Sequence, residues 1–407
     1  MYTLLRPNVL HRFMSLRYMS MAEPKSLVAK RGVCDPTAPA FLTFEDPRAF
    51  KVKSFWEIIR ALGVFRLCSF PVLVNNCGKL MISTKMVLGE RAFSMVMRPS
   101  VYAQFVAGET EREIAESMQK MSSLGLRPML AVPIEEDLGE STGERRYEDN
   151  LVAMLECIHM SHNKGWSKNP MMQLKITALL SPELCVKLTS LLRSERYDLN
   201  LLVKAMEGEA SANKVRVLVD AEYTYINPAL SLVTMAMMKK FNQQSAWIWN
   251  TYQCYLKESR NLLYDAIQTS VDQVFCLGIK LVRGAYMDKE RNLAEKEKRT
   301  DPIHESWENT NERMVDLGID KHSSSVCFGQ LLGMCDHVSL TLAQHGFSVY
   351  KSVPYGTVDN TLPYLVRRAQ ENRAVLQGIR KERDLLRQEL NRRIREKITG
   401  AKTDPKK

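Results

Sequence analysis

The chain has 407 residues, of which 45% are hydrophobic and 25% are charged, with a formal net charge of +11 at pH 7. It contains no continuous apolar run long enough for a spanning helix, so we expect no transmembrane segment. The positive charge is confined to the ends: residues 1–34 carry six basic residues against one acidic, and residues 379–407 carry eleven against five. Residues 35–378 are therefore neutral, which argues against a nucleic-acid-binding fold.

Residues 1–35 form a basic leader. Arg6, Arg12 and Arg17 precede any acidic residue, and apolar residues recur between them at near-helical spacing. This composition predicts a mitochondrial transit peptide, with a disordered basic N-terminus as the alternative. The nine cysteines lack a paired C-x-x-C spacing and the seven histidines do not cluster with acids or cysteines. We therefore expect free thiols in a reducing compartment, and no metal site.

Residues 36–122 are predicted to form a linker followed by a helical region. The linker, residues 36–48, is rich in Pro, Thr and Asp, and an amphipathic run begins at Phe55. Thr110 is followed three residues later by Glu113, which is the pattern of a capping box at a helix start. A second amphipathic helix is expected from that point.

Residues 123–378 alternate short apolar, β-rich runs with amphipathic helices, which is typical of βα units and a parallel sheet. We expect a distorted (βα)₈ barrel, with an open doubly wound sheet as the architectural alternative. No Gly-rich dinucleotide fingerprint follows the first strand, and polar side chains cluster where the runs end, as on the active face of a barrel. The seven expected strands are residues 127–133, 174–179, 215–220, 246–250, 278–282, 326–330 and 348–351.

Seven strands are one fewer than a closed barrel requires. The forty residues between Tyr286 and Val326 are nearly all polar or charged and contain no β-branched run. They predict a charged helix from Asp288 to Thr300 and the end of another helix at residues 312–317, and one barrel strand is expected to be missing. A barrel without that strand leaves two edges unless its flanking strands pair. Residues 379–407 are predicted to form a basic C-terminal helix and tail.

Residues 361–372 are expected to form a helix that follows the last strand and a turn. Pro363 suits the first turn of a helix. Two guanidinium groups and a phenol ring on one face make a clamp for a substrate carboxylate, and a solvated helix with an Arg–Glu pair is the alternative. The residues that share this face are Tyr364, Arg367, Arg368 and Glu371.

Five ordered motifs resemble those of the proline dehydrogenase family, and the resemblance covers roughly residues 45–395. The motifs are residues 219–223, 250–256, 280–286, 328–334 and 364–372. The resemblance implies a distorted (βα)₈ barrel that holds FAD, oxidises a ring imino acid and passes electrons to a membrane quinone. One departure is clear: the family's sixth strand, which ends in a Ser/Thr-His-Asn-Glu motif at the flavin, has no counterpart here.

The resemblance also implies roles for individual residues. Arg367 and Arg368 would bind the substrate carboxylate with support from Lys175, while Asp220 would hold Lys175 or order the site. Tyr364 would pack over the substrate ring, and Leu332 and Tyr286 would form apolar walls. Glu371 would pair with an arginine or reach the cofactor, and Thr310 would reach the adenosine half. The remaining flavin contacts would be Gln253, Lys280, Val282, Arg283, Gly284, Ala285 and Gln330. Arg283 is our candidate for the cation beside the reduced flavin.

Ser352 indicates a subfamily. The family typically has a tyrosine here, and a serine makes room for a ring hydroxyl and can hydrogen-bond to it, as in hydroxyproline dehydrogenases. We therefore expect oxidation of trans-4-hydroxy-L-proline to 1-pyrroline-3-hydroxy-5-carboxylate in the mitochondrial matrix, with peripheral contact to the inner membrane as one option. The alternatives are a neutral packing change at Ser352 in an enzyme acting mainly on L-proline, and a non-catalytic barrel remnant without FAD.

Overall fold

The computed structural model describes residues 42–134, 144–163, 165–167, 169–194, 199–200, 215–306, 308–310, 326–371 and 376–399. The predicted leader, residues 1–35, and the predicted helix end at residues 312–317 lie outside these ranges. The elements described below belong to one compact unit, Phe44–Lys407. None of the helices in the described ranges is both long enough and apolar enough to cross a bilayer.

Helices precede the sheet. Two of them begin with capping boxes, Ser54 with Glu57 and the predicted pair Thr110 with Glu113, so both helix starts satisfy their first backbone N–H groups. Gly89 has a φ of 74° and lies at a kink between two helical segments of α4. The elements of this region are η1 (Pro47–Val52), α2 (Phe55–Cys68), α3 (Pro71–Asn75), α4 (Cys77–Met97), η2 (Arg98–Tyr102), α5 (Ala103–Phe105) and α6 (Glu111–Ser123).

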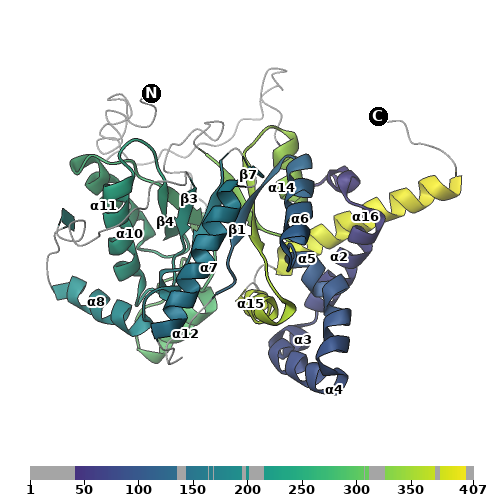
Figure 1. Ribbon diagram of the computed structural model, residues 1–407, viewed down its shortest axis with the longest axis horizontal. Coiled ribbons are helices and arrows are strands. Elements are labelled where there is room, and N and C mark those ends of the chain that lie inside the picture. Colours follow the sequence, from purple (N-terminus) through teal and green to yellow (C-terminus); the bar gives the residue numbers. More distant parts are fainter. Residues whose placement is uncertain are drawn as a thin grey trace. The chain divides into compact units, whose positions relative to one another are not determined.

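The described strands form one seven-stranded parallel sheet in the order β5-β4-β3-β2-β1-β7-β6 (Figure 1). This is the order of a (βα)₈ barrel that has been opened between β5 and β6, since β7 returns to pair with β1. The expected seven-strand, barrel-like sheet is confirmed, and the doubly wound order is excluded. The strands are β1 (Leu126–Ala131), β2 (Met171–Leu174), β3 (Arg216–Val219), β4 (Ile248–Gln253), β5 (Ile279–Val282), β6 (Phe328–Leu331) and β7 (Val349–Pro354).

Helices follow the strands and pack against one face of the sheet. Figure 1 shows α10 and α11 beside β3 and β4, and α6 and α14 on the side of β1 and β7. The barrel helices are α7 (Glu144–Asn163), α8 (Pro182–Ser194), α10 (Asn227–Phe241), α11 (Ser259–Asp272), α12 (Met287–Lys296), α14 (Asp336–Gln344) and α15 (Val358–Glu371). The predicted C-terminal helix is α16 (Leu376–Thr399), and it packs against α2 and η1.

The strand register separates the two faces of the sheet. Val217, Val219 and Ile248 pack with residues of α8, α10 and α11 in an extensive hydrophobic cluster, so this face is the outer one. The alternate residues, beginning with Met129 and Met171, form a smaller apolar cluster on the inner face. Because side chains alternate along a strand, the register assigns each inward position directly.

Two predictions of local structure were wrong. The second strand was expected at residues 174–179, but β2 ends at Leu174 and Ile176–Ala178 form a 3₁₀ turn, η3. The buried carbonyl of Ala178 accepts a hydrogen bond from Asn150 Nδ2 (2.8 Å), so this apolar segment is satisfied without a sheet partner. Pro363 was expected in the first turn, but α15 begins at Val358 and contains Pro363 in its interior.

Candidate active site

The inner-face positions at the carboxyl ends of the strands bring several predicted residues together. Gln253 and Val282 are in register on β4 and β5, and Lys280 is in register with Thr251. Lys175 and Asp220 directly follow β2 and β3, in phase with Gln173 and Leu218 on the inner face. The carboxyl ends of parallel strands form the active face of βα barrels, so this end of the sheet is the candidate site.

Four charged side chains lie at these strand ends. Lys280 Nζ donates a hydrogen bond to Asp220 Oδ1, and the two groups form an ion pair. Both side chains are about one-fifth exposed. Burial raises the pKa of Glu222, while the positive charge of Lys175 opposes the rise. The Asp220 ion pair therefore joins β3 to β5. The role of Asp220 in ordering the site stays a prediction.

Glu222 and Gln253 are held by their neighbours. Glu222 accepts a hydrogen bond from Thr177 Oγ1 at 2.7 Å. The Gln253 side-chain amide donates to the backbone oxygen of Glu222 at 2.9 Å and to the Tyr255 hydroxyl at 2.7 Å. Both amide N–H bonds are thus aimed into the protein, which leaves the Gln253 carbonyl oxygen as an acceptor at the end of β4.

Aromatic and apolar side chains line the loops beside this cluster. Tyr286 is buried at the start of α12, and its ring centroid lies 4.6 Å from that of Tyr223. Leu332 is half-buried, and its backbone N–H donates to the Ser352 carbonyl at 2.9 Å. The two predicted apolar walls, Tyr286 and Leu332, therefore follow β5 and β6, on either side of the opening in the sheet.

Arg283 and the glycine after it lie at the more open end of the site. Arg283 and Gly284 are exposed, and Ala285 is half-buried against the cluster formed by Tyr255 and Ile303. Burial raises the pKa of Cys335 to about 11, and the charge of Arg283 acts against that rise. Arg283 follows β5 and Cys335 follows β6, so both flank the gap between these two strands of the sheet.

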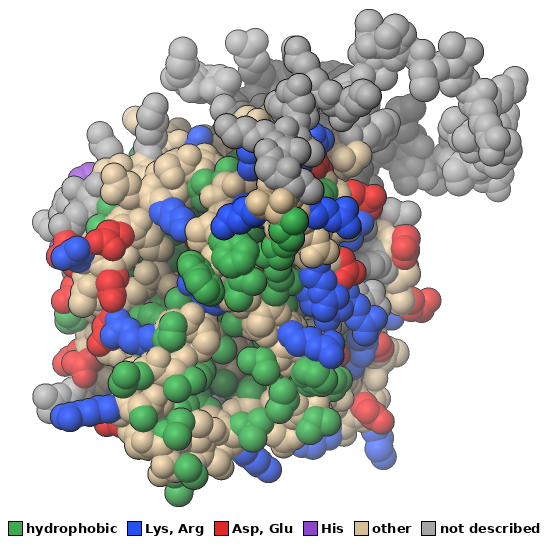
Figure 2. All heavy atoms as spheres, turned by 90° about the vertical axis from the view of Figure 1, so that its right-hand side faces the viewer, with side chains coloured by type: hydrophobic (Ala, Val, Ile, Leu, Met, Phe, Trp, Pro, Cys, Tyr) green, Lys and Arg blue, Asp and Glu red, His purple; other side chains and the backbone are tan. Residues whose placement is uncertain are grey.

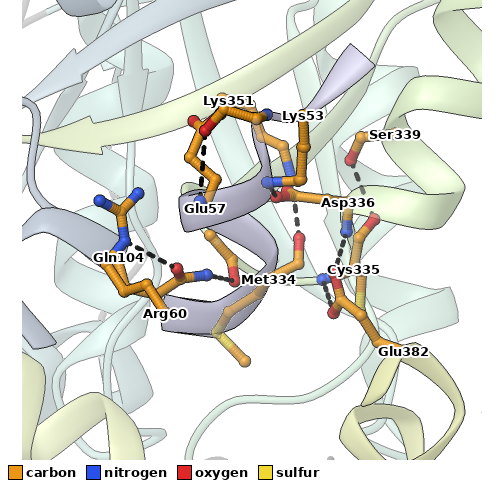
Figure 3. Close-up of polar contacts among 12 residues, drawn as sticks. Lys53, Glu57, Arg60, Gln104, Met334, Cys335, Asp336, Ser339, Lys351 and Glu382 are labelled. Atoms are coloured by element: carbon orange, nitrogen blue, oxygen red, sulfur yellow. Dashed lines mark hydrogen bonds and ion pairs between the residues drawn. The ribbon is translucent and has the colours of Figure 1, made fainter. Parts of the chain in front are cut away.

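The loop after β6, residues 332–335, is anchored from behind by a buried charge network (Figure 3). Lys351 is 1% exposed; its Nζ is 2.7 Å from Asp336 Oδ1 and donates to the carbonyls of Leu331 (3.2 Å) and Met334 (2.7 Å). Lys53 Nζ lies 2.6 Å from the other oxygen of Asp336. Two cations from distant segments thus share one carboxylate.

The same loop is held by the C-terminal helix and by α5. Glu382 of α16 accepts the backbone N–H groups of Cys335 (2.7 Å) and Asp336 (2.8 Å), at the start of α14. Gly333 has a φ of +75°, and a Cβ at this position would collide with the carbonyl of Gln104. The Gln104 side chain donates to the Gly333 carbonyl at 3.1 Å (Figure 3). The loop that carries Leu332 is therefore fixed from three directions.

This network shifts two carboxyl groups in opposite directions. Burial alone would raise the pKa of Asp336, but Lys351 and Lys53 hold the pKa well below its usual range. Burial raises the pKa of Glu382, and the negative charge of Asp336 raises it further. Asp336 is consequently the charged centre of the network, while Glu382 gains and loses its proton at higher pH.

Helix α15 directs its predicted clamp residues away from its packed face. Val358 and Leu362 pack against Phe93 and Tyr102. Tyr364 and Arg368 lie on another side of the helix, with the Arg368 guanidinium carbon 5.4 Å from the centre of the Tyr364 ring. Tyr364, Arg367 and Arg368 are all half-buried. The clamp on a substrate carboxylate stays a prediction.

Three other expected flavin contacts involve Gln330, Thr310 and Glu371. Gln330 is in register with Lys351, whose side chain reaches the helix-covered side, and its amide oxygen accepts the N–H of Leu331 at 2.8 Å. Thr310 is buried, with its hydroxyl 3.5 Å from the Ser306 carbonyl. The side chain of Glu371 lies outside the described residues. Their flavin contacts stay predictions.

The residues present fit a planar group that carries carbonyl oxygens and negative charge. Lys280 and Arg283 supply cations, and the carbonyl oxygen of Gln253 supplies an acceptor for a ring N–H. All four residues of β5 are partly exposed, whereas all six of β7 are buried. Gly329, on the inner face of β6, has open space where a side chain would begin. This side of the site therefore suits a flavin ring.

Several residues that shape the site were missed by sequence reasoning. Gln173 accepts a hydrogen bond from Ser352, and it was overlooked because the second strand was expected to begin after it. Lys351 was included in an expected strand, where a lysine is normally read as solvent-facing. A lysine in the middle of a fully buried strand requires a buried acidic partner. Applied to Lys351, that rule would have predicted an acidic residue such as Asp336 beside it.

A family model described as proline dehydrogenase matches residues 114–313 and 312–381 of the chain. The two matched segments meet where the sequence predicts the missing strand. Hydroxyproline dehydrogenase of Xenopus laevis is 50% identical over 427 residues, covering 88% of this chain and 91% of that protein. The protein called proline dehydrogenase 1, mitochondrial, of Drosophila melanogaster is 27% identical over 554 residues, covering 88% and 81% respectively.

The fold resembles a larger solved protein. The structure of proline utilization A from Bdellovibrio bacteriovorus, inactivated by N-propargylglycine, superposes with a TM-score of 0.58 at 17% identity. The match covers 82% of this chain and 42% of that chain, so this chain corresponds to less than half of the larger protein. This likeness concerns the fold, and it agrees with the barrel-like order of the seven strands.

Proposed function

We propose, on the premise that this chain belongs to the proline dehydrogenase family, that it oxidises trans-4-hydroxy-L-proline to 1-pyrroline-3-hydroxy-5-carboxylate. The observation that carries the proposal is the convergence of Lys175, Asp220 and Lys280 with Ser352 on one inner face. FAD is the proposed cofactor and a membrane quinone the proposed electron acceptor. The proposed compartment is the mitochondrial matrix.

The substrate carboxylate would be held by Arg367 and Arg368, assisted by Lys175. A bidentate guanidinium contact fixes both the position and the orientation of a carboxylate, so the ring carbon next to nitrogen faces one direction. Tyr364 would cover the imino acid ring, and Tyr286 and Leu332 would exclude water from it. When bound, FAD supplies the acceptor for the hydride that leaves this carbon, and the nitrogen releases its proton to water.

Lys280 would lie beside the cofactor, with its charge partly balanced by Asp220. The ion pair with Asp220 holds the Lys280 ammonium group in one position. A cation that is already in place would stabilise negative charge that develops on the flavin ring. Arg283, exposed at the border of the opening, would supply the second cation. Because Lys280 lies on β5 and Arg283 directly follows it, the flavin would lie nearer to β5 than to β7.

An exposed apolar face supports contact with a membrane that holds the quinone. Helices α3 and α4 carry Val72, Met86 and Val87, with exposed fractions of 71%, 79% and 84%. Figure 2 shows hydrophobic side chains gathered on the lower part of this face, with basic side chains at its border. Lys79 and Arg91 add positive charge to α4, so the proposed surface is one that contains anionic lipid.

The test is an oxidation assay of the purified protein with a soluble quinone analogue. We expect trans-4-hydroxy-L-proline to be oxidised with a higher kcat/KM than L-proline. The reverse order would assign the chain to the proline-oxidising branch.

For the membrane contact, Met86→Glu together with Val87→Glu should abolish sedimentation with vesicles containing anionic lipid, while leaving activity with the soluble quinone analogue unchanged. Undiminished sedimentation would refute that surface.

A second candidate function is a non-catalytic binding protein without flavin. The opening of the sheet favours it, because β5 and β6 each pair with a single strand among the described residues. The absorbance spectrum of the purified protein separates the two candidates. Flavin bands in a near-stoichiometric amount would support the enzyme, and a protein that neither carries nor takes up FAD would support the non-catalytic alternative.

A further inference from the structure

Gln173 and Ser352 form a polar pair on the inner face of the sheet, and the pair spans β1. The hydroxyl of Ser352 donates to Gln173 Oε1. Gln173 is in register with Ala131, and Ser352 is in register with Met129. Because adjacent strands lie about 4.8 Å apart, the glutamine side chain crosses one whole strand to reach the serine. The methyl side chain of Ala131 leaves room for that crossing.

The glutamine, and not the serine, is the accessible member of the pair. Ser352 is 2% exposed, whereas Gln173 is only half-buried. Gln173 precedes Lys175 by two residues, so it lies on the same face, about 7 Å deeper in the sheet. A ring held near Lys175 by its carboxylate therefore has Gln173 beneath it, with Ser352 behind Gln173.

The amide of Gln173 has unused hydrogen-bonding capacity. A glutamine side chain accepts two hydrogen bonds and donates two, and Ser352 accounts for one. The side chain makes no second hydrogen bond with any residue in the described part of the chain. Rotating the amide by 180° exchanges the roles of the two partners, and the pair still offers one donor and one acceptor. A hydroxyl group, which both donates and accepts, matches that combination.

We propose that Gln173 is the residue that recognises the ring hydroxyl of the substrate, and that Ser352 is a positioning residue that holds the amide of Gln173. The inference rests on the proposed function and deepens it. L-proline would leave the polar groups of Gln173 facing an apolar ring carbon, and unmatched buried polar groups disfavour a substrate that lacks their partner. Discrimination between the two imino acids therefore depends on β2 as well as β7.

The decisive variant is Gln173→Leu, which keeps the approximate size and removes the amide. We expect kcat/KM for trans-4-hydroxy-L-proline to fall at least tenfold and that for L-proline to change less than threefold. Tyr350→Phe is the matched control, because Tyr350 lies on the same face of β7 and its hydroxyl donates to the Asn169 carbonyl at 3.0 Å. This control should leave the ratio of the two kcat/KM values unchanged.

The positioning role of Ser352 has its own readout. Ser352→Ala should lower the preference for hydroxyproline, and Ser352→Thr, which retains a hydroxyl, should restore most of it. Because the serine acts through the glutamine, the double variant Gln173→Leu with Ser352→Ala should show the preference of Gln173→Leu alone. Additive losses would overturn the positioning role and assign the hydroxyl contact to Ser352 itself.

A binding measurement separates failure of this inference from failure of the proposed function. The rise in Tm caused by each imino acid reports binding without turnover. Trans-4-hydroxy-L-proline should raise the Tm of the native protein more than L-proline does, and Gln173→Leu should remove that difference. Preferential binding without turnover would refute the proposed function and retain the inference. The inference would be overturned if Gln173→Leu reduced the rise in Tm equally for both imino acids. It would also be overturned if the two imino acids raised the Tm of the native protein equally.

Discussion

Lys351→Met tests the buried network behind the candidate site. Methionine has nearly the length of lysine and leaves little cavity, so the variant removes mainly the charge and its hydrogen bonds. Lys351 Nζ contacts Asp336 Oδ1 at 2.7 Å, the Met334 carbonyl at 2.7 Å and the Leu331 carbonyl at 3.2 Å, in a position that is 1% exposed. Breaking a buried ion pair costs about 3–5 kcal/mol. Since Lys53 still contacts Asp336, we expect about 3 kcal/mol.

The assay is urea-induced unfolding followed by circular dichroism, with the free energy of unfolding extrapolated to water. Lys381→Met is the matched control, because Lys381 is paired with the exposed Glu45, and surface pairs contribute about 0–1 kcal/mol. Adding Asp336→Asn to Lys351→Met should deepen the loss, because it removes the carboxylate that still pairs with the largely buried Lys53. A Lys351→Met protein within 1 kcal/mol of the native protein would refute the reasoning.

Three further predictions concern the substrate clamp, the C-terminal helix and the turn before α15. Arg368→Lys should abolish turnover and retain bound flavin, because an ammonium group cannot hold a carboxylate bidentately; unchanged steady-state kinetics would remove Arg368 from the clamp. The raised pKa of Glu382, about 7 against an ordinary 4.5, contributes stability below pH 4.5 that is lost as pH rises through 7. Glu382→Gln should therefore reduce the fall in unfolding free energy between pH 5 and 7 by at most about 1.4 kcal/mol per pH unit. Burial lowers the pKa of His337 to about 4, which has the opposite effect on the pH dependence. That effect cancels when Glu382→Gln is compared with the native protein. Identical pH dependence would contradict that assignment. Tyr102→Phe removes a 2.6 Å hydrogen bond to the Gly356 carbonyl, so we expect a loss of about 1 kcal/mol and a higher KM for the imino acid; unaltered stability and KM would show that the bond does not position α15.

Local pattern was sufficient for most of the fold. Apolar, β-rich runs ending in polar residues predicted six of the seven strands near their observed positions and misplaced the second, because strands buried on both faces have that composition. The error at β2 arose from the same rule: the apolar residues of η3 are buried as in a strand, but the Ala178 carbonyl accepts a hydrogen bond from a side chain of the neighbouring helix α7. A buried segment is apolar whether it forms a β-strand or a 3₁₀ turn, so its composition alone does not distinguish the two conformations.

Asp220 was predictable at the end of its strand, whereas Lys175 fell inside the strand expected at 174–179 and was assigned to the site through the family resemblance. The two-residue period of a strand fixes the face, and the strand end fixes the depth. The pairing of Lys280 with Asp220, and of Lys351 with Asp336, was not predictable in this way, since each joins segments whose proximity depends on the complete sheet. Gln173 was not predicted as a site residue, because the second strand was expected to begin after it.

The position of Glu382 has a consequence for the order in which the chain acquires its structure. The backbone N–H groups at the start of α14 find their carboxylate on the last helix, and Asp336 finds one of its lysines ahead of the first strand. A nascent chain that has been synthesised only as far as β7 has the sheet but not the partner for this turn. Contacts between sequence-distant segments slow folding, so the final helix should complete the molecule in a late step that follows assembly of the sheet.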